Sequence, residues 1–174
     1  MQSPTIIVLA SGRGERFIAS GGTTHKLQAL LSGKPVLQHT LDAVRASGLP
    51  WHLEQGPHAG MGDAIAAAVR ATADAAGWLV LPADLPLVQP QTLRELAQVW
   101  PERDVVVPVY QGQRGHPVRF AARFGAALMA LAGDRGAGAI ARGAGAAKYV
   151  VQDAGCVADI DTLQDLQRAA AVVE

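Results

Sequence analysis

Near its start the chain reads Thr5-Ile6-Ile7-Val8-Leu9-Ala10-Ser11-Gly12-Arg13-Gly14-Glu15-Arg16-Phe17, an apolar run that leads straight into a glycine-rich loop. A short, continuous run of branched apolar residues is typical of a strand buried on both faces, as strands of a parallel sheet are. Small residues after such a strand let backbone N–H groups turn inward, where they can bind an anion. We therefore expect a parallel α/β sheet whose ligand site lies at the carboxyl end of this strand.

The rest of the chain alternates between short apolar blocks and segments with helical periodicity. Leu37, Leu41 and Val44, for example, share one face of a helix. This alternation predicts right-handed crossovers and a three-layer α/β/α architecture around a twisted, mostly parallel sheet. We expect strands at 5–9, 51–54, 78–81, 104–109, 117–120, 149–151 and 156–160, and helices at 35–47, 62–76, 91–100, 124–131, 136–142 and 162–173.

The composition favours one globular domain over residues 1–174 and argues against several classes of protein. Hydrophobic residues make up 49% and charged residues 17%, which excludes a disordered chain. Fifteen basic and fifteen acidic side chains cancel, so the basic stripe of a nucleic-acid binder is not expected. A single cysteine, Cys156, allows neither an intrachain disulfide nor a cysteine-built zinc site. No apolar run approaches membrane-spanning length, and we expect a cytoplasmic protein without membrane or nucleic-acid partners.

The loop after the first strand is the first candidate site. Ser11, Gly12 and Gly14 can present backbone amides to an anion, and Arg16 can add a charge-assisted hydrogen bond. The loop is not a dinucleotide fingerprint, because Phe17 stands where the third glycine belongs. A surface turn with solvated arginines is the alternative interpretation.

Carboxylates form the second candidate site. Asp84 follows strand 78–81 between two prolines, where it could hold a hard cation such as Mg²⁺ or serve only as a turn or helix cap. Asp159 and Asp161 precede the last helix, and Asp161 could be its N-cap with Asp165 in the first turn. An anion loop combined with metal-type carboxylates suggests a nucleoside triphosphate with Mg²⁺.

The stretch at 9–17, with Lys26 after it, resembles the signature loop LAAGxGxRM…K of the MobA-like nucleotidyltransferases. Later segments follow in that family's order, and two of them are most similar to the molybdopterin cytidylyltransferase branch. The family-like segments are Gly60-Met61, Asp84-Leu85-Pro86 and Asp159-Ile160-Asp161-Thr162 with Asp165, and the branch-like ones are 108–117 and 133–137.

The resemblance implies a Rossmann-like fold of the nucleotide-diphospho-sugar transferase type and a Mg²⁺-dependent reaction. A nucleotide would pass from CTP or another triphosphate to a phosphate on molybdopterin or a similar acceptor, with a molybdoenzyme as a conceivable protein partner. The resemblance assigns Leu9, Ala10, Ser11, Gly12, Gly14, Gly60 and Met61 to the nucleotide, Arg16 and Lys26 to catalysis, Arg114, Gly115 and His116 to the acceptor, and Asp84 with Asp159 or Asp161 to the metal.

Departures from the family pattern leave several points open. Residues 18–25 lengthen the path to Lys26, which could therefore lie on a flap away from the site. Residues 48–62 leave room for one strand only, so a βα unit of the sheet is expected to be trimmed. Asp63 adds an acid near the expected base site, and Ser11 leaves the choice of base open.

Two other functions compete with this interpretation. One keeps the reaction but changes the acceptor to a sugar phosphate or another phosphorylated alcohol. The other is a nucleotide-binding protein without catalysis that regulates or chaperones a molybdenum enzyme. A dinucleotide oxidoreductase is disfavoured, because no acidic residue follows Gly14 at the ribose-binding distance. Among the histidines, His39 is expected to be structural and His116 to be functional.

Overall fold

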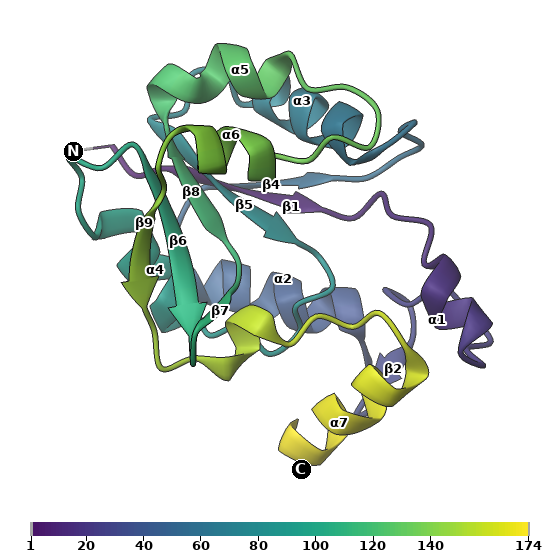
Figure 1. Ribbon diagram of the computed structural model, residues 1–174. Coiled ribbons are helices and arrows are strands. Elements are labelled where there is room, and N and C mark those ends of the chain that lie inside the picture. The colour runs from purple at the N-terminus through teal and green to yellow at the C-terminus, as the bar shows by residue number, and fades with distance from the viewer. Residues whose placement is uncertain (1, 174) are drawn as a thin grey trace.

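A twisted seven-stranded sheet forms the centre of the computed structural model, which describes residues 2–173 (Figure 1). Its strands are β1 (Thr5–Leu9), β4 (Trp51–Glu54), β5 (Gly77–Pro82), β6 (Val105–Tyr110), β7 (Gln113–Arg114), β8 (Val118–Ala121) and β9 (Ala147–Val150). The order is β4-β1-β5-β8-β6-β7, and β9 pairs with β6. β1 is parallel to β4 and β5, and β6 is parallel to β9, whereas β8 runs antiparallel between β5 and β6.

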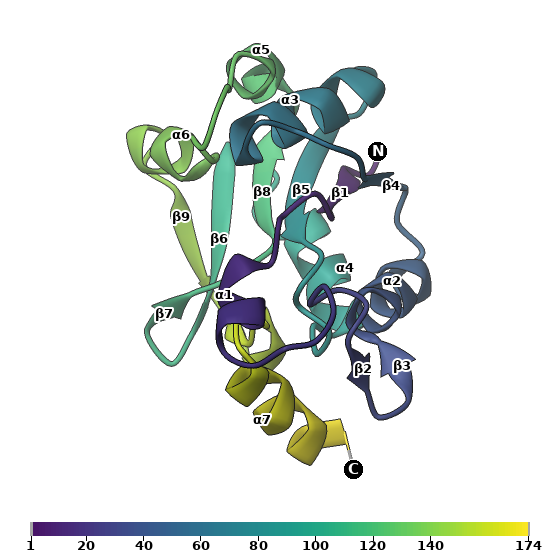
Figure 2. The same cartoon turned by 90° about the vertical axis from the view of Figure 1, so that its right-hand side faces the viewer.

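Helices cover both faces of this sheet, so the predicted three-layer architecture is confirmed. The helices are α1 (Glu15–Ala19), α2 (Val36–Ser47), α3 (Met61–Ala71), α4 (Pro90–Gln98), α5 (Gly125–Met129), α6 (Gly138–Gly143) and α7 (Leu163–Val173). In Figure 1, α3, α5 and α6 lie on one face, and α2 and α4 lie on the other. A small hairpin, β2 (Leu30–Leu31) with β3 (Lys34–Pro35), precedes α2 (Figure 2). No helix among residues 2–173 has both the length and the apolar character needed to cross a bilayer.

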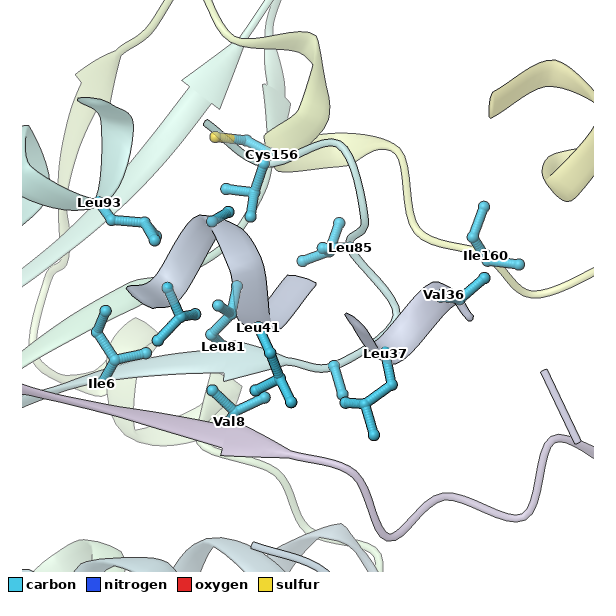
Figure 3. Close-up of a cluster of buried hydrophobic side chains, with 14 of the residues drawn as sticks. Ile6, Val8, Val36, Leu37, Leu41, Leu81, Leu85, Leu93, Cys156 and Ile160 are labelled. Atoms are coloured by element: carbon cyan, nitrogen blue, oxygen red, sulfur yellow. The ribbon is translucent and has the colours of Figure 1, made fainter. Parts of the chain in front are cut away.

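The sheet separates two hydrophobic clusters, because alternate side chains of a strand point to opposite faces. Along β1, Ile6 and Val8 belong to the cluster on the side of α2 and α4, whereas Ile7 and Leu9 belong to the cluster on the side of α3. Figure 3 shows the first cluster, in which Cys156 packs with the leucines of neighbouring elements. Burial on both faces accounts for the continuous apolar sequence of β1.

Two predicted elements differ from the structure. The strand predicted at 156–160 is wrong, since Ala154–Val157 form a turn of 3₁₀ helix. Asp153 causes this turn, because its carboxylate accepts a hydrogen bond from the backbone N–H of Gly155 at 2.8 Å. The helix predicted at 62–76 ends at Ala71, where Thr72 leaves helical geometry and its hydroxyl accepts from the Trp78 indole at 2.9 Å.

The segment between α2 and α3 holds one strand, β4, at the edge of the sheet, as predicted. β4 pairs with β1 over its whole length, so the first strand has a neighbour on each side. The carboxyl ends of β1, β4 and β5 therefore lie at one edge of the sheet, where the loops that follow them meet.

Candidate functional site

A cleft of about 690 Å³ opens where these strands end. The loops after β1 and β5, the start of α3, the segment between β7 and β8 and the approach to α7 form its walls. Most of the predicted site residues lie on these walls, although they come from distant parts of the sequence. Those residues are Ser11, Gly12, Gly14, Arg16, Lys26, Gly60, Met61, Asp84, Arg114, Gly115, His116, Asp159 and Asp161.

Leu9 and Ala10 do not line the cleft. The side chain of Leu9 is buried in the hydrophobic cluster on the α3 side, and its carbonyl accepts from the N–H of Ala83 at 3.0 Å. The N–H of Ala10 donates to the carbonyl of Glu54 at 2.9 Å. These two contacts tie the glycine loop to the strands on both sides and occupy the carbonyl of Leu9 and the N–H of Ala10.

The glycine loop needs its glycine at position 14. Gly14 has φ 67°, in the left-handed region that side chains rarely adopt. A second constraint comes from His25, whose Nε2 lies 2.7 Å from the carbonyl of Gly12 and whose Nδ1 accepts from the N–H of Leu27 at 3.2 Å. These partners place the proton on Nε2 of a neutral ring. Sequence reasoning missed this role of His25, for which its position directly before Lys26 was the only signal.

Lys26 reaches the site in spite of the longer loop. Its Nζ lies 2.7 Å from Oδ2 of Asp84 and 3.1 Å from Oδ1 of Asp161. Burial alone would lower the pKa of Lys26, but the two carboxylates outweigh burial and raise it above its ordinary value. The lysine is therefore charged.

Asp84, Asp159 and Asp161 come together as a group, each with a carboxylate oxygen within 4.8 Å of the others. Backbone contacts fix this arrangement, since the N–H of Ile160 donates to the carbonyl of Asp84 at 2.9 Å. The hydroxyl of the fully buried Thr40 donates to the carbonyl of Ala83 at 2.7 Å. The loop after β5 is thus held from both the α2 and the α7 sides.

Asp161 is not the N-cap of the last helix. Thr162 takes that position, because its hydroxyl accepts from the N–H of Asp165 at 3.2 Å. Asp165 returns the contact by accepting from the N–H groups of Asp161 and Thr162 at 3.1 and 2.8 Å. This reciprocal capping box leaves the carboxylate of Asp161 free to face the cleft.

The pKa values of Asp159 and Asp161 are shifted in opposite directions. Burial raises the pKa of Asp159 to about 6, helped by its hydrogen bond with Asp161 and the charge of that neighbour. For Asp161, burial works in the same direction, but the hydrogen bonds from Asp159 and Lys26 and the nearby Arg16 guanidinium lower its pKa overall. Nη1 of Arg16 lies 3.3 Å from Oδ2 of Asp161, and the arginine side chain is 77% exposed.

The donor set fits a hard divalent cation. Oδ1 of Asp84 is buried without a hydrogen-bond partner among the described residues. Buried carboxylate oxygens are costly unless something pairs with them, and oxygen-only sites suit Mg²⁺ and Mn²⁺. Asp84 also does not cap a turn, because its other oxygen contacts Lys26.

His116 lies in the opposite wall of the cleft, next to Gly115. A side chain at Gly115 would put its Cβ 2.4 Å from the carbonyl oxygen of Cys156, so only glycine allows this close approach. The N–H of His116 donates to the same carbonyl at 3.0 Å. Burial lowers the pKa of His116 below its ordinary value, although the charge of Asp84 opposes this, and its Nδ1 has no partner within residues 2–173.

Cys156 does not supply a nucleophile. Burial, followed by the charge of Asp153, raises the pKa of its thiol far above the ordinary value. The prediction that this residue belongs to the core is confirmed, since only 1% of it is exposed.

The start of α3 is hydrogen-bonded to the loop before α6. The N–H of Gly62 donates to the carbonyl of Gly133 at 2.8 Å, and Oδ2 of Asp63 accepts from the N–H of Gly133 at 2.9 Å. The carboxylate of Asp63 is thus engaged by this loop. Asp63, the acidic residue expected near the nucleotide base, therefore holds the start of α3 to the loop before α6.

A histidine pair near this helix was also missed. Glu54 accepts from Nε2 of His52 and Nε2 of His58, each at 2.9 Å, and His58 lines the cleft. The signal was the spacing of His52 and Glu54, which puts both side chains on one face of β4. His39, by contrast, is half-buried with Nε2 2.7 Å from the carbonyl of Leu31, the structural role that was predicted.

Comparison with known sequences finds the MobA-like NTP transferase domain family, which matches residues 42–150. The bifunctional protein GlmU of Desulfitobacterium hafniense is 29% identical over 114 residues, covering 53% of this chain and 24% of GlmU. The GlmU of Alkalilimnicola ehrlichii is 32% identical over 117 residues, covering 55% of this chain and 25% of that protein. The chain thus spans about a quarter of the length of these relatives.

Solved structures share the fold over nearly the whole chain. Rv0371c of Mycobacterium tuberculosis superposes with a TM-score of 0.82 at 23% identity, covering 98% of both chains. Its complex with manganese gives 0.76 at 22% identity, covering 98% of this chain and 99% of that one. Molybdopterin-guanine dinucleotide biosynthesis protein A of Archaeoglobus fulgidus gives 0.64 at 18% identity, covering 97% and 98%.

Proposed function

Because this chain belongs to the MobA-like NTP transferase domain family, a family of nucleotidyltransferases, we propose that it transfers a nucleotide from a triphosphate, with CTP favoured, to a phosphate on molybdopterin or a similar acceptor. The observation that carries the proposal is the convergence of Lys26, Asp84 and Asp161 beside the glycine loop. Cations and metal-type carboxylates next to an anion loop are what a triphosphate and its divalent cation require.

The proposed reaction is an in-line displacement at the α-phosphorus. An oxygen of the acceptor phosphate forms a bond to this phosphorus, the bond to the bridging β-phosphate oxygen breaks, and pyrophosphate leaves. Such a transfer needs positioning and charge neutralisation more than a protein nucleophile. The protonated thiol of Cys156 is consistent with that requirement.

Each part of the cleft has a role in this reaction. The backbone amides of Ser11, Gly12 and Gly14 would hold the triphosphate, and Arg16 and Lys26 would balance charge on the α-phosphate and the leaving group. The wall at Gly60-Met61 would line the base.

The metal would be Mg²⁺, held by Asp84 together with Asp159 or Asp161. When bound, the ion neutralises phosphate charge and fixes the triphosphate in place. The manganese complex of the similar protein Rv0371c supports a divalent cation in this fold.

The wall that carries Arg114 and His116 would receive the acceptor. Arg114 is exposed and suits a phosphate, and the neutral His116 has a free ring nitrogen that can hydrogen-bond a neutral group. The name of the similar Archaeoglobus protein supports a molybdopterin-type acceptor, and the similarity of residues 108–117 to the cytidylyl branch supports CTP.

Pyrophosphate release tests the proposal. The protein is mixed with Mg²⁺, each acceptor in turn (molybdopterin, then sugar phosphates) and either CTP or GTP. We expect release with CTP and molybdopterin, whereas release only with a sugar phosphate would move the activity to the alternative acceptor class. Nucleotide binding without any release would leave the non-catalytic regulator, which the shortened segment 48–62 and the longer path to Lys26 suggested.

A further inference from the structure

The ammonium of Lys26 contacts two of the three carboxylates that could hold a cation. It lies 2.7 Å from Oδ2 of Asp84 and 3.1 Å from Oδ1 of Asp161, and only 14% of the lysine side chain is exposed. An ammonium at these distances donates hydrogen bonds to both oxygens. Lys26 thus places a positive charge on one oxygen of Asp84 and one oxygen of Asp161, two of the carboxylates that would hold a divalent cation.

The base of the lysine is fixed, whereas its end can move. On one side His25 is held by hydrogen bonds at both ring nitrogens. On the other side Leu27 is buried, and its carbonyl accepts from the N–H of Leu37 at 3.0 Å. The four-carbon stem of Lys26 has several rotatable bonds, so its ammonium can leave the carboxylates without a change of the backbone.

A divalent cation that binds Oδ2 of Asp84 and Oδ1 of Asp161 would lie close to the ammonium of Lys26 and be repelled by it. Magnesium and manganese bind carboxylate oxygens at roughly 2.0–2.2 Å, which would bring such an ion against the ammonium of Lys26. Charges of the same sign at that separation repel strongly in a half-buried cleft. Lys26 therefore opposes metal binding at these oxygens until its ammonium moves to another anion.

We propose that Lys26 competes with the divalent cation for Asp84 and Asp161, so that the protein takes up the cation efficiently only together with a triphosphate that draws the ammonium away. This inference rests on the proposed function, because it needs a polyanion in the cleft. The lysine is thereby a positioning residue for metal binding in addition to its proposed contact with phosphate. Its consequence is that metal and nucleotide bind with positive coupling.

Removing the competitor should strengthen binding of the metal alone. Mn²⁺ is titrated without nucleotide into the wild-type protein and into Lys26→Met, and free Mn²⁺ is followed by its electron paramagnetic resonance signal. We expect Lys26→Met to bind Mn²⁺ roughly tenfold or more tightly than the wild type, because loss of a contacting positive charge favours the second cation. Adding Asp84→Asn to Lys26→Met should abolish the gain, which would locate the ion.

Lys34→Met is the matched control. Nζ of Lys34 lies 2.7 Å from Oδ2 of Asp42, the same distance as in the cleft, but both side chains are about half exposed and Lys34 is absent from the cleft lining. This variant should bind Mn²⁺ as the wild type does. If Lys26→Met does not fold, Lys26→Gln replaces it, and a rise in melting temperature on adding Mn²⁺ reports binding independently.

Equal Mn²⁺ affinity in the wild type and Lys26→Met would overturn the inference. The proposed function would survive that result if the wild type still bound a triphosphate with Mg²⁺. Conversely, tighter Mn²⁺ binding by Lys26→Met in a protein whose wild type binds no triphosphate would support competition at the carboxylates and overturn the proposed function.

Discussion

Two aspartates of this protein have the same kind of neighbours but different surroundings. Asp161, in the cleft, lies 3.1 Å from Nζ of Lys26, and Asp42, on the outside of α2, lies 2.7 Å from Nζ of Lys34. Each also has an arginine nitrogen at 3.3 Å. Both carboxyl groups have a lowered pKa.

The difference lies in what surrounds each cluster. We call Arg16, Lys26 and Asp161 the cleft cluster, and Lys34, Asp42 and Arg45 the surface cluster. Only the cleft cluster has two further carboxylates within reach, and Lys26 is shared with one of them. Asp161 is distant in the sequence from Arg16 and Lys26, whereas the surface cluster is built on α2 and the hairpin before it. Ion pairs of similar length can thus lie on the open surface in one place and in a candidate binding site in another.

The largest expected contrast is in turnover. Arg16→Ala should lower kcat/KM by about 10²–10³-fold, because a cation aimed at the transferred phosphate is lost. The protein should still fold, since the Arg16 side chain is 77% exposed. Arg45→Ala, which removes the arginine of the surface cluster, should leave kcat/KM unchanged in the same pyrophosphate assay. Equal losses in the two variants would remove the distinction between the clusters.

The next contrast is in stability. Lys26→Met should lower the free energy of unfolding by about 1–3 kcal/mol, because it leaves half-buried carboxylates without their cation. Urea denaturation without added metal measures this change. Lys34→Met should show no measurable loss, because Lys34 and Asp42 are open to solvent and exposed pairs contribute little. A Lys34→Met variant as unstable as Lys26→Met would contradict the comparison.

A smaller effect concerns the cap that frees Asp161. Thr162→Ala should lower the free energy of unfolding by about 1 kcal/mol, the usual cost of losing an N-cap hydroxyl. Thr162→Ser keeps the hydroxyl and should retain most of the stability. Thermal unfolding of both variants and the wild type measures these changes in stability. If Thr162→Ala were as stable as the wild type, the contact with Asp165 would contribute nothing to stability.

The smallest effect is a pH dependence of opposite sign in the two clusters. Asp159, beside the cleft cluster, has its pKa raised to about 6 from 3.8, so the folded state binds more protons between these values. Its contribution to stability is full at lower pH and is lost as the pH rises through about 6. Asp159→Asn should therefore become more stable relative to the wild type as the pH rises from about 4 to 7.

Asp42 behaves in the opposite way. Its pKa is lowered, so its contribution is present above its ordinary value of 3.8 and is lost as the pH falls through the folded-state value. Asp42→Asn should therefore lose its disadvantage as the solution becomes acidic. Urea denaturation of both variants, from below pH 3.8 up to about pH 7, measures these two trends. A change of stability with the same sign in both variants would show that the two carboxylates do not differ in environment.

Much of the fold could be predicted where local pattern and burial agree. The continuous apolar run of β1 gives its bounds directly, since a strand covered on both faces favours apolar residues along its length. Prediction failed at 156–160, because apolar residues there pack on the core without pairing in the sheet. The capping carboxylate of Asp153 decided that outcome, and apolar periodicity carries no information about it.

The candidate site was predictable in its members but not in its connections. Asp84 follows β5, so its place at the carboxyl edge of the sheet follows from topology, whereas Asp161 is held there by the hydrogen bond from the N–H of Ile160 to the carbonyl of Asp84. That Lys26 returns to them after a long loop depends on the contacts of His25 and Leu27, which only the folded chain shows. That Thr162 caps the last helix in place of Asp161 likewise became clear only from the hydrogen bonds.

A calorimetric titration tests the central claim most directly. CTP, GTP, UTP and ATP are each titrated, with and without Mg²⁺, into the wild-type protein and into Asp84→Asn. The account predicts that the wild type binds one triphosphate, with CTP favoured, and that this binding requires Mg²⁺ and is lost in Asp84→Asn. Failure of all four to bind the wild type, or equal binding by Asp84→Asn, would contradict it.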